Sequence, residues 1–321
     1  MTYYSELSED DRKKSYSFIE DFILKKVPDW SQWNSSINTD SVEQAFRKEI
    51  EAMEERDFEF LILHSGYIPD YYGSDSSAET LYSKLTESLV CQWAKRVGFK
   101  DSYLQTQKSN KEDITIKLDD KIIVCDAKSF RLGRSQPAPN VKDVIKKQAY
   151  ETWLNCYDEK SRIGGLTTFP SLHDWKNKGE AYSYYTEGNP SIMLLFYEQM
   201  AYMLNQNIKA DKIIEFLNSY NTYFTKASKD KSLYWNAVIK NLFKKDTYNE
   251  YMKEAQKYLV EKVDAALQAL KDKSQSIEKS IKEELKNKTS QELRDIAFKA
   301  RLKIESAGIQ SQIKNIEKFR K

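Results

Sequence analysis

The segment Asp113–Lys128 constrains the fold of this 321-residue chain more than any other, and it reads DITIKLDDKIIVCDAK. It contains two short runs rich in Ile and Val, residues 113–118 and 121–128. The dipeptide Asp119-Asp120 separates them, and a two-residue connection of turn-forming residues is typical of the tightest β-hairpins. The segment therefore predicts an antiparallel hairpin.

The register of this hairpin brings charged side chains together. If Leu118 pairs with Lys121, then Asp113 lies opposite Asp126, with Cβ atoms about 4.5–5.5 Å apart. Side chains alternate faces along a strand, so Lys128 shares the face of Asp126. The opposite face would be apolar and suited to a core, with Ile114, Ile116, Leu118, Ile123 and Cys125.

Two carboxylates placed opposite each other destabilise a sheet unless something compensates their charge. A Mg²⁺ ion would do so, since it is usually held by one or two carboxylates together with water and phosphate oxygens. A neighbouring lysine suits an anionic transition state or an attacking water. We therefore take Asp113, Asp126 and Lys128 as candidate catalytic residues, with the two aspartates as metal ligands. A solvated hairpin edge would carry the same residues.

The basic residues are concentrated just after this point. The whole chain has a formal net charge of only +2, which implies no particular partner. Residues 121–150, however, hold seven basic and two acidic side chains, a local charge of +5 that is compatible with phosphate contacts. A solvated basic face is the alternative. The candidate DNA-binding residues are Arg131, Arg134, Lys142, Lys146 and Lys147.

The order of elements indicates an α/β core with a mixed sheet. Helical spacing predicts helices over residues 8–26, from residue 40 or 41, over 78–97 (ending before Gly98) and near 141–157. Apolar runs predict strands at 163–169 and 192–197, and the chain from about residue 198 reads as almost wholly helical, with a capping box at Thr289–Glu292 opening the last helix. We expect a helical N-terminal region (1–75), a catalytic core (76–205) and a helical C-terminal region (206–321). The segment 66–77 reads as a loop.

Glu87 lies on the helix predicted at 78–97, on a face with Thr80, Ser83, Cys91 and Ala94. Because this helix leads into the hairpin, Glu87 is a candidate third carboxylate. An exposed helical glutamate is the alternative.

Several classes of protein are excluded by what the sequence lacks. No run of about 18 apolar residues is present, and the first residues do not resemble a signal peptide. Three widely spaced cysteines favour reduced thiols in a cytoplasm over a disulfide framework. With only two histidines, a zinc enzyme or a histidine-dependent nuclease is disfavoured.

The pattern Asp113…Asp126-Ala-Lys128 resembles the PD-(D/E)xK nuclease motif, although Glu112 stands where the idealised motif has proline. The block Asp126-Ala-Lys-Ser-Phe-Arg-Leu-Gly-Arg134 is similar to the HindIII-like type II restriction endonucleases. The likeness extends to Leu81-Tyr-Ser-Lys84, to Ile192-Met-Leu-Leu-Phe196 and, more loosely, to the helix from Thr289. It covers residues 77–205 well and the C-terminal region weakly.

This resemblance implies a restriction-endonuclease-like core and a Mg²⁺-dependent homodimer. Such an enzyme cuts both strands of a short palindrome, with AAGCTT as a candidate site, and leaves 5′ overhangs. The resemblance also implies a companion methyltransferase that protects host DNA. Asp113, Asp126 and Lys128 would form the catalytic set, with Glu87 as the acid from the helix. A repair or junction-resolving nuclease of the same fold, and a non-catalytic DNA-binding protein, remain alternatives.

Overall fold

The computed structural model describes residues 3–27, 38–69, 72, 76–106, 110–131, 147–171, 185–186 and 190–319. The chain divides into two compact units, Met1–Val263 and Asp264–Lys321. The expected division into regions 1–75, 76–205 and 206–321 concerns function and stays a prediction.

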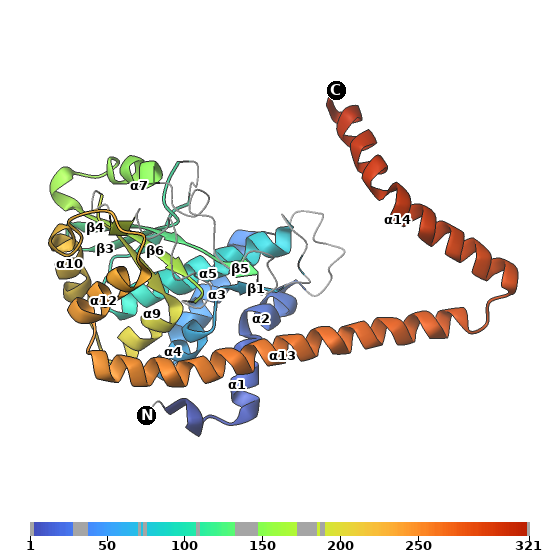
Figure 1. Ribbon diagram of the computed structural model, residues 1–321, viewed down its shortest axis with the longest axis horizontal. Coiled ribbons are helices and arrows are strands. Elements are labelled where there is room, and N and C mark those ends of the chain that lie inside the picture. The colour runs from blue at the N-terminus through green and yellow to red at the C-terminus, as the bar shows by residue number, and fades with distance from the viewer. Residues whose placement is uncertain are drawn as a thin grey trace. The chain divides into compact units, whose positions relative to one another are not determined.

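The first unit is built on a five-stranded mixed sheet, which confirms the predicted α/β class. Its strands lie in the order β2-β3-β4-β6-β7 (Figure 1). Neighbours from β2 to β4 are antiparallel, whereas β4, β6 and β7 are parallel to one another. The strand bounds are Tyr103–Leu104 (β2), Ile114–Leu118 (β3), Lys121–Ala127 (β4), Arg162–Phe169 (β6) and Ile192–Phe196 (β7).

The β3–β4 hairpin has the predicted register. Leu118 pairs with Lys121 and Ile114 pairs with Cys125. Asp119 in the connecting turn has a φ of 55°, in the left-handed region that aspartate tolerates better than most residues. The ladder ends at Ile114, so Asp113 stands just beyond the last paired residue of β3.

Helices cover both faces of this sheet. Helix α5 (Ser77–Arg96) packs on β3 and β4, and its Trp93 donates an indole hydrogen bond to the Met200 carbonyl of α9 (Tyr197–Asn205). Helix α7 (Lys147–Leu154) packs on β4 and β6, and Figure 1 shows it on the side of the sheet away from α9. A Cβ at Gly165 would lie 2.4 Å from the Tyr150 ring, so glycine lets α7 approach β6 closely.

The N-terminal region contains four α-helices among the described residues: α1 (Glu9–Tyr16), α2 (Phe18–Lys26), α3 (Thr39–Ala52) and α4 (Glu55–Leu63). The predicted single helix over 8–26 is wrong, because the chain breaks at Ser17 into α1 and α2. Its predicted start is confirmed, since the Ser8 hydroxyl accepts a hydrogen bond from the Asp11 amide. Helix α5 ends before Gly98, as predicted, and Gly98 has a φ of 117°.

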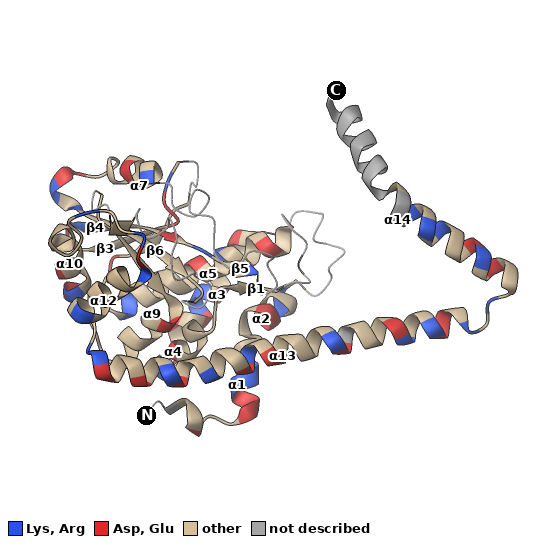
Figure 2. Ribbon diagram, in the orientation of Figure 1, with Lys and Arg blue, Asp and Glu red and all other residues tan. Residues whose placement is uncertain are grey.

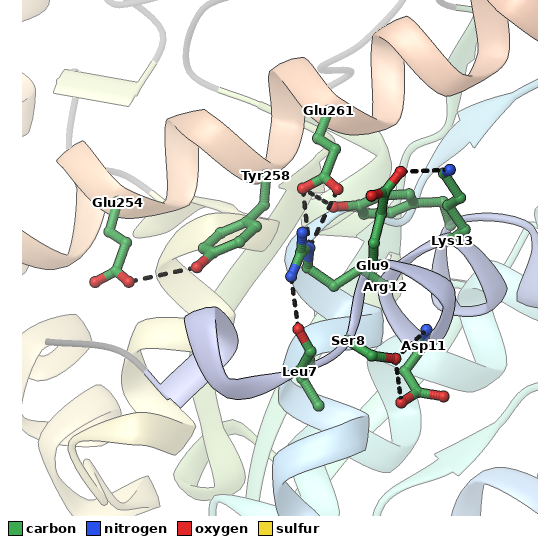
Figure 3. Close-up of polar contacts among 10 residues, drawn as sticks. Leu7, Ser8, Glu9, Asp11, Arg12, Lys13, Glu254, Tyr258 and Glu261 are labelled. Atoms are coloured by element: carbon green, nitrogen blue, oxygen red, sulfur yellow. Dashed lines mark hydrogen bonds and ion pairs between the residues drawn. The ribbon is translucent and has the colours of Figure 1, made fainter.

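Helix α1 is joined to the first part of α13 (Lys245–Leu285) by a polar cluster (Figure 3). The Arg12 guanidinium contacts the Glu261 carboxylate at 3.0 Å, and the Tyr16 hydroxyl donates to the same carboxylate. Arg12 also donates to the Leu7 carbonyl at 2.6 Å. These contacts tie residues from the two ends of the first unit together.

The C-terminal region is helical, as predicted. Its helices are α10 (Ala210–Asn218), α11 (Tyr220–Tyr223), α12 (Lys231–Leu242), α13 and α14 (Ser290–Phe319). The capping box at the start of α14 is confirmed, because the Thr289 amide donates to Glu292 and the Glu292 amide donates to the Thr289 hydroxyl. Figure 2 shows acidic and basic residues interspersed along α13 and along the described part of α14.

Among the described residues, one α-helix and three short strands were not predicted from the sequence: α4, the two-residue strands β1 (Tyr67–Ile68) and β5 (Phe130–Arg131), and β2. Strands β1 and β5 pair in parallel as a small second sheet. All three cysteines are free thiols, as expected. None of the described helices combines the length and the apolar composition that crossing a membrane requires.

His64, at the end of α4, predicts a pH dependence of stability. Its buried ring donates from Nε2 to the Ser15 carbonyl, and burial together with the charge of Lys262 lowers the His64 pKa to about 3. The unfolded chain therefore takes up a proton near pH 6.5 that the folded chain resists. The contribution of His64 to the free energy of unfolding is complete above pH 6.5. Below pH 6.5 it falls by up to about 1.4 kcal/mol per pH unit.

We therefore expect the free energy of unfolding, measured in urea, to fall less between pH 6.5 and pH 4 in His64→Gln than in the wild type. Other titrating groups are common to both proteins and cancel in the comparison. Parallel losses would contradict the buried neutral histidine.

Candidate active site

Asp126 and Lys128 lie at the C-terminal end of β4 and form an ion pair. The Lys128 Nζ atom is 2.7 Å from the Asp126 carboxylate. The Asp126 side chain is only 12% exposed, and that of Lys128 is 28% exposed. Asp126 is thus a buried acid whose nearest counter-charge is a half-buried lysine two residues along the chain.

Burial raises the pKa of Asp126 well above its usual range. The adjacent Lys128 opposes this shift, and the negative charge of Asp113 adds to it. The lysine therefore compensates the burial of Asp126 only in part. A site with this electrostatic balance favours an additional cation over a second negative charge.

Asp113 is positioned by backbone atoms of the hairpin. Its Oδ2 accepts a hydrogen bond of 3.1 Å from the Ala127 amide, which lies between Asp126 and Lys128. Its own amide donates to the Cys125 carbonyl, also at 3.1 Å. The structure thus brings Asp113, Asp126 and Lys128 to one end of the hairpin.

Glu87 lies in the middle of α5 and is buried, with 7% of its surface exposed. Burial raises the pKa of Tyr197, and the charges of both Glu87 and Asp113 contribute to that rise. The charges of Glu87 and Asp113 thus both act on Tyr197. The alternative of an exposed helical glutamate is wrong, because Glu87 is buried in the folded protein.

Tyr197, at the start of α9, is a residue that the sequence analysis missed. Its hydroxyl donates to the Lys128 carbonyl at 3.3 Å, and the Lys128 amide donates to the Thr168 carbonyl of β6. The backbone of Lys128 is thereby held on both sides. The apolar run before Tyr197 predicted a strand but carried no signal of this contact.

The residues present fit a Mg²⁺ ion. Within the part of the chain that the structure describes, no group of three His, Cys, Asp or Glu side chains forms a metal cluster. Mg²⁺ does not need one, because one or two carboxylates with water and phosphate oxygens complete its octahedron. Asp113 and Asp126 are the side chains that could hold such an ion.

The structure describes only two of the five candidate DNA-binding residues, Arg131 and Lys147. The Arg131 guanidinium contacts the Glu79 carboxylate at 2.9 Å and donates to the carbonyls of Pro69 and Tyr72. It therefore links β5 to the start of α5. Lys147 is half-buried at the first residue of α7. Arg134, Lys142 and Lys146 lie outside the described residues.

A known family matches most of the chain. The family described as HindIII restriction endonuclease matches residues 23–318, which include every candidate site residue. The curated proteins contain no significant match to the chain.

The electrostatics of the pair predict opposite effects of two substitutions on the metal-free protein. At pH 8, Asp126→Asn removes a buried charge and should raise the free energy of unfolding by about 1 kcal/mol. Lys128→Ala removes the compensating cation and should lower it by a similar amount. Urea unfolding measures both. A loss of stability in both variants would show that Asp126 is stabilising as an ionised group.

Proposed function

The chain belongs to the HindIII restriction endonuclease family and is a site-specific deoxyribonuclease; we propose that it uses Mg²⁺ to hydrolyse both strands of a short palindromic DNA site. The observation that carries this proposal is the end of the β3–β4 hairpin. There, the buried Asp126 pairs with Lys128 beside an Asp113 that is oriented by the Ala127 amide. These are the residue types that metal-assisted phosphodiester hydrolysis requires.

In the proposed reaction, water attacks the scissile phosphorus in line with the departing oxygen. When bound, Mg²⁺ supplies a Lewis acid that offsets phosphate charge and eases ionisation of the water. Asp113 and Asp126 hold the ion. Lys128 orients the water or stabilises the negative charge that develops on the phosphate. Glu87 adds a further acid from α5.

The basic residues after the site are proposed to follow the duplex away from the cut phosphate. Arginine reads guanine bidentately in the major groove, whereas lysines contact phosphates. We assign these contacts to Arg131, Arg134, Lys142, Lys146 and Lys147. Arg131 must exchange its ion pair with Glu79 for a base edge in order to take part.

A homodimer would match the symmetry of the DNA. One active site cuts one strand, and two sites related by a two-fold axis cut equivalent positions on antiparallel strands. The second unit exposes large apolar side chains, which supports an interface with a second copy. They are Leu267, Ile277, Ile281, Leu293, Ile296, Phe298 and Leu302. We further propose that the enzyme acts in the cytoplasm, beside a methyltransferase that modifies the same site, with AAGCTT as the first candidate.

Substitution of the catalytic set should separate its roles. Asp113→Asn and Asp126→Asn should abolish cleavage while DNA binding without metal persists or tightens, because negative charge near phosphate is lost. Lys128→Arg keeps the charge but changes its shape and hydrogen-bonding geometry, so it should lose most turnover, as should Lys128→Ala. Single-turnover cleavage and DNA binding without metal provide the measurements. Normal cleavage by Lys128→Arg would show that Lys128 contributes only its positive charge.

Glu87→Gln should impair cleavage strongly if Glu87 serves the site. Glu79 is unsuitable as a control because it pairs with Arg131. The matched control is Glu43→Gln of α3, since Glu43 is 6% exposed, accepts a hydrogen bond from Ser88 of α5, and pairs with Arg47, which is not a proposed DNA contact. Equal rates for the two variants, once corrected for folded protein, would remove Glu87 from the catalytic set.

The function itself is tested by incubating the purified protein with unmethylated phage DNA and Mg²⁺. We expect discrete fragments whose sequenced ends carry identical 5′ overhangs at a palindrome, and a dimer on the DNA. A smear would indicate a nonspecific nuclease. Asymmetric ends or a monomer on the cut site would contradict the two-fold arrangement.

A further inference from the structure

A second buried carboxylate lies next to the candidate active site in the sequence. Glu112 precedes Asp113 directly and is only 1% exposed. Its Oε1 atom accepts hydrogen bonds from three side chains: the Gln105 amide at 3.2 Å, the Thr115 hydroxyl at 2.7 Å and the Tyr157 hydroxyl. Burial of a carboxylate is costly unless its hydrogen bonds are satisfied, so this cluster is a built feature of the fold.

The cluster joins three parts of the first unit. Gln105 follows β2, Thr115 belongs to β3, and Tyr157 lies in the connection from α7 to β6. Tyr157 is itself anchored, because the Arg162 guanidinium donates to its carbonyl at 2.8 and 3.0 Å. Glu112 is therefore held between both strands at this edge and the loop beyond α7.

The same cluster also holds the backbone of Asp113. The Gln105 amide N–H donates to the Asp113 carbonyl at 3.1 Å, while its side chain donates to Glu112. On the other side, the Asp113 amide donates to the Cys125 carbonyl. The assigned strand pairs end at Ile114, and the Gln105–Asp113 bond continues the β2–β3 register by one pair, so these backbone hydrogen bonds set where the Asp113 backbone lies.

We propose that Glu112 is a positioning residue for the metal site: through Gln105, Thr115 and Tyr157 it fixes the backbone from which the Asp113 carboxylate reaches the cation. The inference rests on the proposed function, in which Asp113 is a metal ligand. Glu112 does not contact the reacting atoms. Without the Glu112 carboxylate, Asp113 would still be present as a ligand, but its position relative to Asp126 would no longer be fixed.

The test compares Glu112→Gln with Glu59→Gln in the full-length protein. Glu59 of α4 is a matched control, because it is 2% exposed and accepts hydrogen bonds from the hydroxyls of Tyr4 and Tyr251 and from the Asn205 amide, none of which is a candidate site residue. Three quantities are measured for each variant: the Mn²⁺ dissociation constant from the paramagnetic resonance signal of free Mn²⁺, the Mg²⁺ concentration that half-saturates cleavage, and DNA affinity without metal.

In Glu112→Gln we expect the two metal constants to rise about 10- to 100-fold. DNA affinity should remain that of the wild type. In Glu59→Gln the metal constants should stay at the wild-type value even if the melting temperature falls. Equal metal constants in the two variants would overturn the proposal. If wild type binds Mn²⁺ but cuts no DNA, the proposed function fails instead, and the two failures are distinct.

If Glu112→Gln does not fold, Tyr157→Phe tests the positioning role of Glu112 instead. It removes one of the three donors to Glu112 and should raise the Mn²⁺ dissociation constant about 3- to 10-fold. An unchanged constant in folded Tyr157→Phe would also overturn the proposal.

Discussion

Repulsion between two carboxylates is the constraint on which the rest of this structure depends. The β3–β4 register brings Asp113 and Asp126 to one end of the hairpin, where burial and mutual charge raise the pKa of Asp126. Lys128 offsets part of that charge, and the Ala127 amide donates a hydrogen bond to one carboxylate oxygen of Asp113. The contacts of Glu112 and Tyr197 hold the backbone on which these groups stand. A stable fold thus keeps an arrangement that favours a cation.

The hairpin could be predicted because its determinants are local. A two-residue turn between two alternating segments specifies a register without knowledge of the rest of the chain. The short strands β1 and β5 depend instead on each other, and Tyr67 gives no sign that Phe130 is its partner. The break at Ser17 was missed for a different reason: the helix start at Ser8 and the apolar stripe of α2 were joined into one helix, although α1 is almost wholly polar.

The candidate site residues could likewise be predicted only where their determinants are local. Asp113, Asp126 and Lys128 could be found from spacing on one hairpin, whereas the burial of Glu87 depends on how α5 packs against β3 and β4. The local charge of +5 identified Arg131, but charge does not reveal a partner, and the fold pairs Arg131 with Glu79. The burial of Glu112 was only partly signalled: a buried acid requires donors, and Gln105 and Thr115 lie nearby in the chain, whereas Tyr157 lies 45 residues away and is brought in by the fold.

The most direct test of the central claim is a crystal structure of the full-length protein with its cognate duplex and Mn²⁺, using anomalous scattering to locate the metal. The claim predicts an anomalous peak within about 2.0–2.3 Å of carboxylate oxygens from both Asp113 and Asp126, with Lys128 Nζ beside the scissile phosphate. A peak bound by other residues, or an intact Asp126–Lys128 ion pair with no metal beside it, would contradict the assignment.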